Sequence, residues 1–241
     1  SADMNTDFGG STSRPTVCNH CRTMHRTFLL PTRNLGTTQG DTPFHFTHQN
    51  PLAPDFASAI VPNAHTAAWA GWFDEEADPA RGLFPSDHRL WTTGLESLRE
   101  SLDSLDAILS ERDAYLSLRP ACGLVLSDPH SVAALLNESP SGRLRILADP
   151  VAMLTPEMAA HAEDHLPRML DKLGNFETTS AIVLSGYEAA SEDRLTHRPL
   201  GENESFDRML IEAWQQSAFT ERDVVVLSDA CIALIERARI A

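Results

Sequence analysis

The sequence predicts an α/β fold built on a parallel β-sheet, and two observations lead to this prediction. Five apolar runs of strand length are spread over residues 63–241, and each run is continuous rather than alternating, which is typical of parallel strands covered on both faces. Helical patterns separate the runs, so the connections are expected to be right-handed crossovers. The runs are His65–Ala70, Ala114–Leu118, Leu144–Ala148, Ala181–Leu184 and Val224–Leu227.

The first 62 residues differ from the rest. They show no sustained hydrophobic period, and glycine, proline and small polar residues interrupt them. Only Thr27–Leu30 and Ala57–Val61 are apolar enough to predict short strands. We therefore expect an irregular N-terminal arm over 1–62, with one or two early strands, and a domain of repeated βα units over 63–241.

Capping signals predict where the helices begin. Thr93 and Glu96 match a capping box, and leucines spaced by three and four residues follow them. Asp128 and Thr155 each precede a proline, which predicts an N-cap followed by proline at the first helical position. Two further helices are expected around Phe206–Trp214 and Cys231–Ile235.

The chain length bears on whether the sheet closes. Five units over 63–241 correspond to about 36 residues each, and an eight-stranded barrel typically needs about 250 residues. The chain has 241 residues and is therefore short of a full barrel by one unit or more, unless its early units are irregular. An open, doubly wound sheet is the structural alternative.

Composition and charge argue against several classes of protein. Hydrophobic residues make up 42% of the chain and charged residues 22%, as in a typical globular protein. The 19 Lys+Arg and 34 Asp+Glu residues give a net charge of −15, which opposes binding to nucleic acid or to an anionic membrane surface. Neither a membrane span nor a secretory signal is visible. We expect no nucleic-acid or membrane partner, and the cysteine usage favours a cytoplasmic location.

Charged residues end two of the predicted strands, where ligands bind in parallel sheets. Arg119 and Asp149 follow apolar runs, and a charge in such a place is desolvated unless it is paired or binds a ligand. Arg119 could bind an anion, and Asp149 could bind a metal or act as a catalytic acid or base. The alternatives are a buried ion pair between the two, or Asp149 capping its own loop.

Aromatic residues suggest a second part of the site. His65 could serve as a general base or a sugar ligand, with Trp69 and Trp72 stacking on the face of a sugar. The alternative for His65 is an ordinary core histidine.

A cluster of metal-ligand residue types lies in the N-terminal arm. Cys18, Cys21 and His25 are close in sequence, and zinc favours tetrahedral sets of cysteine and histidine. No second CxxC follows, so an exposed, unpaired CxxC is the alternative.

Five segments between about residues 64 and 230 share their order and motifs with one family. They are Ala68–Trp72, Gly94–Leu109, Tyr115–Pro120, Leu144–Pro150 and Arg198–Asp207. Together they resemble the sugar phosphate isomerase/epimerase family, the xylose-isomerase-like TIM barrels. The resemblance implies a parallel (β/α) barrel of TIM type, which the length allows to be incomplete, and a role in carbohydrate metabolism.

The resemblance also implies metal-assisted isomerisation or epimerisation, but the implied ligands are mostly replaced. Arg119 stands at the first Glu position, and its positive charge would repel a cation. The Asp position is kept as Asp149, whereas Val183 stands at the His position and Leu227–Ser228 ends the last strand without a Glu. One retained ligand cannot hold a hard divalent cation, which takes about six donors.

We therefore predict a divergent relative that binds a small sugar or an anionic ligand, with altered or lost catalysis. Arg119 would hold a carboxylate or phosphate bidentately. His197 and Arg198, in the loop before the Leu-Gly segment, would contribute to binding, unless that loop is only a surface connection.

A different class of function stays open beside it. The alternative is a non-catalytic interaction module whose Cys/His-rich arm, with or without zinc, binds a partner. An incomplete barrel could also cover its open edge with a second copy, as a homo-oligomer.

Overall fold

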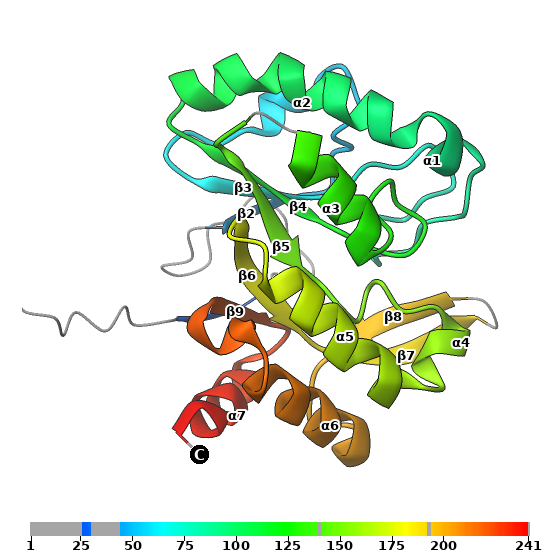
Figure 1. The fold of residues 1–241 in the computed structure, drawn as a ribbon, viewed down its shortest axis with the longest axis vertical. Helices are drawn as coiled ribbons and strands as arrows, with labels where there is room; N and C mark the ends of the chain where they lie inside the picture. The colour runs from blue at the N-terminus through cyan, green and yellow to red at the C-terminus, as the bar shows by residue number, and fades with distance from the viewer. Residues whose placement is uncertain (1–25, 30–43, 139–140, 192–193, 241) are drawn as a thin grey trace, which may run out of the picture.

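A seven-stranded parallel sheet forms the centre of the computed structural model, which describes residues 26–29, 44–138, 141–191 and 194–240 (Figure 1). The order across the sheet is β1-β9-β6-β5-β4-β3-β2. All five predicted strands of the region 63–241 are confirmed. The strands are β1 (Thr27–Leu29), β2 (Phe44–Thr47), β3 (His65–Trp69), β4 (Tyr115–Arg119), β5 (Leu144–Ala148), β6 (Thr179–Leu184) and β9 (Asp223–Val226).

The strand order is that of an incomplete TIM-type barrel. From β2 to β6 the strands pair in chain order, and the first strand pairs with the last, as it does in a barrel. Within the described residues, β1 and β2 form the two edges and are not paired with each other. The rings of Phe28 and Phe44 nevertheless meet edge to face, with centroids 6.1 Å apart. Coverage of this edge by a second copy stays a prediction.

One of the two short strands expected in the first 62 residues forms and the other does not. Thr27–Leu30 contains β1, whereas the expected strand Ala57–Val61 is wrong: a 3-10 helix, η1 (Phe56–Ala59), covers most of it. The backbone there bonds locally, Ser58 N–H to Asp55 O at 2.9 Å, and this buries Phe56. The strand β2 was not predicted, because its alternation lasts only four residues.

Helices cover the outer face of the sheet (Figure 1). The expected caps at Asp128 and Thr155 are confirmed, since each side chain accepts backbone N–H bonds at its helix start. The helices are α1 (Arg89–Thr92), α2 (Gly94–Glu111), α3 (Pro129–Glu138), α4 (Pro156–Ala159), α5 (Ala162–Gly174), α6 (Glu204–Gln215), the 3-10 helix η2 (Ala218–Glu221) and α7 (Asp229–Ile240). Of the described helices, none is long and apolar enough to span a membrane.

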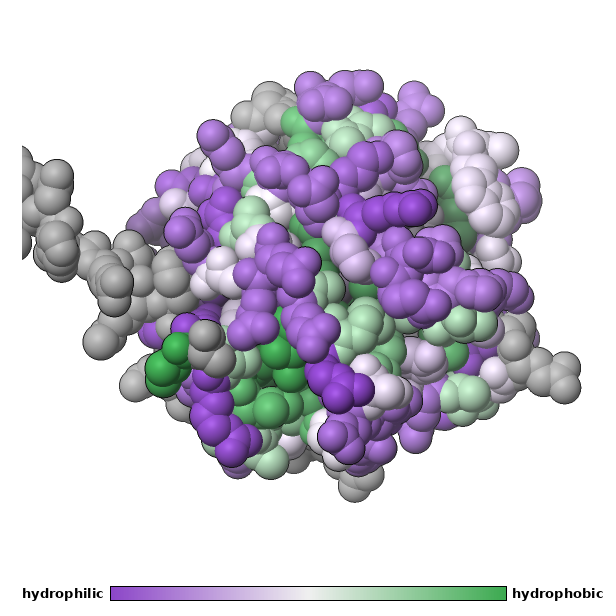
Figure 2. Space-filling model, turned by 60° about the horizontal axis from the view of Figure 1, so that its bottom comes forward, coloured by the Kyte–Doolittle hydropathy of each residue, from purple (hydrophilic) through white to green (hydrophobic). Residues whose placement is uncertain are grey.

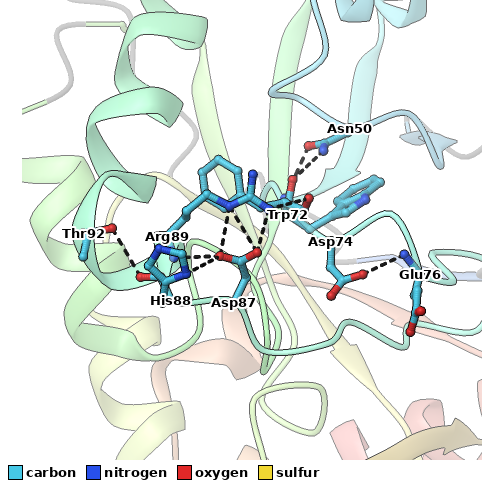
Figure 3. A network of polar contacts seen from close by, with 9 residues as sticks. Asn50, Trp72, Asp74, Glu76, Asp87, His88, Arg89 and Thr92 are labelled. Carbon is cyan, nitrogen blue, oxygen red and sulfur yellow. Dashed lines mark hydrogen bonds and ion pairs between the residues drawn. The ribbon is translucent and has the colours of Figure 1, made fainter.

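The predicted capping box at Thr93 is wrong, because Thr93 joins two helices. It ends α1 with a backbone bond to Arg89 O, and its side chain makes no cap for α2. The polar network at this junction lies one turn earlier, where Arg89 donates to Asp87 and to the Phe73 carbonyl (Figure 3). These Arg89 bonds lower the pKa of Asp87 to about 2.

Alternation along the strands separates an inner from an outer set of side chains. The inner set fills the barrel, and the outer set packs beneath the helices. On β4, Leu116 and Leu118 belong to the outer set, so Ser117 and Arg119 face inward. The same alternation turns Asp149 inward, two residues after Leu147. The inner set is Phe28, Phe44, Phe46, Ala67, Leu147, Ala181, Val183 and Val225.

An antiparallel hairpin of β7 (Gly186–Ser191) and β8 (Arg194–Arg198) follows β6 directly. It projects from the carboxyl end of the sheet, at the right of Figure 1. The sequence predicts only a loop here. The strands were missed because they are polar and only partly buried, which leaves no apolar run to detect.

The side of the molecule that carries α6 and α7 has a groove between these two helices. Its lining combines apolar residues, Ile211, Leu234 and Ala238, with charged residues such as Arg208 and Arg237. Figure 2 shows apolar side chains grouped between polar ones on this side of the molecule.

His65 begins β3 at the amino end of the barrel. Its ring stacks on Tyr115 with centroids 4.8 Å apart, and its Nδ1 lies 3.4 Å from Ser117 Oγ. Burial and the nearby Arg145 lower the pKa of His65 below its ordinary value of 6.5, against the smaller opposing effect of Asp223.

Acidification is expected to destabilise the protein partly through His65. A histidine with a lowered folded-state pKa contributes stability that is present above the unfolded value of 6.5 and is lost as pH falls through the folded value. Urea unfolding at about pH 8 and about pH 5 should therefore show that the free energy of unfolding falls more for the native chain than for His65→Phe. Equal losses in both proteins would contradict this role.

Candidate functional site

Asp149, the residue after β5, is the centre of a buried polar cluster. Its side chain has no solvent exposure, and its Oδ2 accepts from Arg119 Nε at 2.6 Å and Nη2 at 2.5 Å. Its Oδ1 accepts the Ala152 N–H at 3.0 Å. The structure thus shows the buried ion pair and the loop cap that the sequence left as alternatives. The pair forms because β4 and β5 are neighbours whose carboxyl ends meet.

The cluster keeps Asp149 ionised. Burial by itself would raise its pKa, but the charges of Arg119 and His197, with hydrogen bonds from His197 and Ala152, hold the pKa well below its usual range. A carboxylate that already accepts from four N–H groups is a poor proton acceptor. Its geometry suits it to orient the donors around it.

The hairpin brings His197 to the same carboxylate. His197 Nε2 lies 3.2 Å from Oδ1 and 3.1 Å from Oδ2 of Asp149, and 3.4 Å from Arg119 Nη2. The imidazole is 13% exposed, compared with 0% for the carboxylate beneath it. His197 is therefore the cluster's more accessible ionisable group.

Trp69, the last residue of β3, holds the other side of Arg119. The guanidinium carbon lies 3.9 Å from the centroid of the indole, a cation–π contact. The indole is fixed in turn, since its Nε1 donates to the Pro79 carbonyl at 2.9 Å. Arg119 is thus clamped between an aromatic face and a carboxylate.

A cavity of about 230 Å³ opens over this cluster at the carboxyl ends of the strands. Its walls combine apolar and basic groups: Phe46, Trp69, Leu227, His48, Arg81, Arg119 and His197. A second cavity, of about 130 Å³, lies against Phe84, Cys122 and Val151. His197 and Gly82 line both cavities, so the imidazole stands at the boundary between them.

His48 lines the cavity beside Arg119. The pKa of His48 is lowered, first by burial and then by Arg119, with Asp78 opposing. Sequence reasoning did not place His48 here, because β2 was not recognised as a strand. Its register, with Thr47 beside Ala68, sets His48 beside Trp69.

Of the residues singled out from the sequence, Trp69, Arg119, Asp149 and His197 come together. Three do not. His65 lies at the opposite end of β3 from Trp69. Trp72 packs against Phe84 outside the cavity, with its carbonyl bonded to Asn50 (Figure 3). Arg198 is paired with Asp207.

Arg198 points away from the cavity although it follows His197. Successive residues of a strand face opposite sides, and Arg198 is buried in an ion pair with Asp207 at 3.3 Å. Its Nε also donates to the Tyr187 carbonyl at 2.9 Å. Arg198 therefore anchors the hairpin to α6. Cys18, Cys21 and His25 lie outside the described residues, so the zinc site stays a prediction.

The residues around Asp149 do not fit the divalent metal that the family resemblance implies. Both carboxylate oxygens are already held by donors, and the neighbouring strand presents the Arg119 guanidinium where a metal ligand would be needed. Among the described side chains that contact Asp149, only the His197 imidazole is of a metal-ligating type. Within the described ranges, no group of three or more His, Cys, Asp or Glu residues could hold a metal ion.

Comparison with solved structures supports the fold. The chain is similar to a D-tagatose 3-epimerase-like protein, with a TM-score of 0.53 and 12% identity over 82% of this chain and 76% of that chain. A 3-keto-D-glucoside 4-epimerase from E. coli follows, with a TM-score of 0.46 and 15% identity over 73% and 64%. A D-psicose 3-epimerase has a TM-score of 0.43 and 12% identity over 67% and 48%.

No family model and no curated protein matches the sequence. At such identities, the first of these structures shows a shared fold alone. The expected α/β fold, an incomplete parallel barrel of TIM type, is thereby confirmed for this chain.

Proposed function

We propose that this protein binds a small sugar or a sugar-derived anion in the 230 Å³ cavity, with a site that does not depend on a divalent metal. The observation that carries the proposal is the Arg119–Asp149–His197 cluster beneath the cavity. Buried ionic groups presented at a concave opening, at the carboxyl ends of parallel strands, are typical of a ligand site.

The cavity walls match such a ligand. The volume is below the roughly 300–1,000 Å³ of pockets for drug-sized molecules, which favours a small one. Trp69 and Phe46 offer apolar surface for the C–H face of a sugar ring, and Arg119 and His197 offer polar contacts for its oxygens. The fold neighbour with a TM-score of 0.53 is described as epimerase-like for the sugar D-tagatose, which supports a sugar over other small molecules.

The local charge allows the ligand to be anionic. Arg81 and Arg119 line the cavity together with two histidines, in a chain whose net charge is −15. The Asp149 carboxylate lies behind Arg119 and does not reach the cavity surface. A carboxylate or phosphate on the ligand would therefore meet cationic groups first.

Calorimetric titration tests this proposal. The panel contains D-tagatose, D-psicose, D-fructose, D-fructose 6-phosphate and D-gluconate. We expect at least one member to bind, and Trp69→Phe to weaken that binding about threefold or more through loss of aromatic surface. The matched control is Trp91→Phe, because Trp91 is 72% exposed and does not line the cavity.

Two results would contradict the proposal. One is no heat of binding for any member of the panel. The other is equal affinity in the Trp69 and Trp91 variants, which would place the ligand elsewhere.

A further inference from the structure

We infer that Arg119 and His197 form a metal-independent proton-transfer site. His197 removes a proton from the carbon beside a ligand carbonyl, and Arg119 stabilises the negative charge that develops on the carbonyl oxygen. The inference rests on the proposed function, because it needs a sugar with a carbonyl group in the 230 Å³ cavity.

Arg119 has a free donor group on the cavity side. Its Nε and Nη2 donate to Asp149, and one face of the guanidinium lies over the Trp69 ring. Among the described residues, none accepts a hydrogen bond from Nη1. Nη1 is also not one of the fully buried side-chain atoms that lack a hydrogen-bond partner. Its N–H groups are therefore exposed to the cavity that Arg119 lines. A fixed, desolvated guanidinium of this kind is suited to stabilise an oxyanion.

The tautomer of His197 follows from its partner. Nε2 faces both oxygens of an ionised carboxylate, which only accepts, so Nε2 carries the hydrogen. Arg119 Nη2, at 3.4 Å, is also a donor and by itself favours the other tautomer, but the two shorter carboxylate contacts, at 3.2 and 3.1 Å, outweigh it. A neutral His197 then keeps its lone pair on Nδ1. The described part of the chain gives Nδ1 no hydrogen-bond partner.

Gly82 keeps the Nδ1 edge of His197 open. A Cβ on Gly82 would lie 3.8 Å from His197 Nδ1 and 3.2 Å from the Trp69 ring, in the wall shared by the two cavities. Gly82 also has φ of +68°, which disfavours any other residue. The lone pair and the Arg119 Nη1 group are therefore two unpartnered polar groups on one cavity wall.

These groups complete a balanced reaction step. The C–H bond next to the carbonyl breaks and its proton goes to His197 Nδ1. Its electron pair forms a C=C bond, and the carbonyl π pair moves to the oxygen, which accepts hydrogen bonds from Arg119 Nη1. Return of the proton to the same carbon gives the epimer once the enolate has turned its other face to Nδ1. Return to the former carbonyl carbon gives the isomer, with the proton of the neighbouring hydroxyl group passing to the former carbonyl oxygen. No oxidant or metal is consumed.

Asp149 is a positioning residue in this scheme. Its carboxylate holds Nε2–H and faces the imidazolium that forms when Nδ1 takes the proton, without exchanging a proton itself. Asp149 carries the negative charge of the cluster and Arg119 carries a fixed positive charge. The positive charge that His197 gains with the proton is therefore stabilised by the Asp149 carboxylate.

Nitrogen-15 NMR of histidine-labelled protein tests the assignment without any ligand. Above about pH 8, where histidine is neutral, we expect His197 to show a protonated Nε2 and an unprotonated Nδ1, with the signal assigned by its loss in His197→Gln. In Asp149→Asn we expect this tautomer preference to weaken, which loss of packing alone would not cause. A protonated Nδ1 in the native protein would overturn the inference.

Deuterium exchange tests the reaction. The probes are dihydroxyacetone and D-fructose in heavy water, with proton NMR following the hydrogens next to the carbonyl. We expect exchange above the buffer rate, unchanged by EDTA, and lowered about 100-fold or more in His197→Gln. Arg119→Lys should also slow it, and the matched control His161→Gln, at an exposed position, should not.

The outcomes separate this inference from the proposed function. Sugar binding without exchange above the buffer rate overturns the inference and leaves the binding proposal standing. Exchange that EDTA abolishes also overturns it, because a metal would then be required. Absence of both binding and exchange overturns both.

Discussion

Replacing Asp149 with alanine should lower the free energy of unfolding by about 3–5 kcal/mol, because the substitution leaves a buried guanidinium without its counter-charge. Arg119 is only 7% exposed, and no other described carboxylate is paired with it. The substitution also removes the acceptor of the Ala152 N–H. Urea unfolding followed by circular dichroism measures the loss.

Two further variants make this prediction specific. Glu138→Ala breaks the exposed pair with Arg99 and should cost about 1 kcal/mol or less, because Glu138 is 61% exposed. Combining Asp149→Leu with Arg119→Met removes both buried charges and should recover much of the loss, while removing the groups that serve the proposed reaction. An Asp149→Ala cost as small as that of Glu138→Ala would show that the pair is not buried as described.

The same carboxylate has a defined pH dependence. Because the folded-state pKa of Asp149 lies below its ordinary value of 3.8, its contribution to stability is present above that value and is lost as pH falls through the folded value. The difference in the free energy of unfolding between the native chain and Asp149→Ala should thus stay constant around neutral pH and shrink only in strong acid.

Gly123→Ala should destabilise the protein by about 2–5 kcal/mol, from backbone strain and overpacking together. Gly123 has φ of +83°, and a Cβ there would stand 2.2 Å from the Phe84 carbonyl oxygen, which is backbone and cannot rotate away. Phe84 packs edge-on against Trp69, with centroids 5.2 Å apart. Relief of the clash would therefore shift the wall that supports Arg119, and sugar binding should weaken as well.

Two other glycines separate the causes of this effect. Gly201 has φ of +107° and open space around its Cβ position, so Gly201→Ala reports strain alone, about 1–3 kcal/mol. Gly142 has open space and no positive φ, so Gly142→Ala should change stability by about 1 kcal/mol or less. If Gly123→Ala costs no more than Gly201→Ala, contact with Phe84 is not tight.

The central strands could be predicted from the sequence because a strand buried on both faces is a continuous run of apolar residues. Leu144–Ala148 is almost wholly apolar, and the structure shows it covered by the inner and the outer set. Segments whose sequence lacks such a run were missed or misassigned. Phe44–Thr47 is too short to show its period. Ala57–Val61 is apolar because Ile60 belongs to the core, although the backbone there turns instead of extending.

For the candidate site, the sequence by itself determined that Arg119 and Asp149 end neighbouring strands, since a desolvated charge after an apolar run is a local signal. It did not determine which of His197 and Arg198 joins them. These two residues are adjacent and both polar, but strand alternation sends one toward Asp149 and the other toward Asp207. That choice depends on the register of a hairpin and on how it docks beside β5, which are long-range contacts that only the tertiary structure decides.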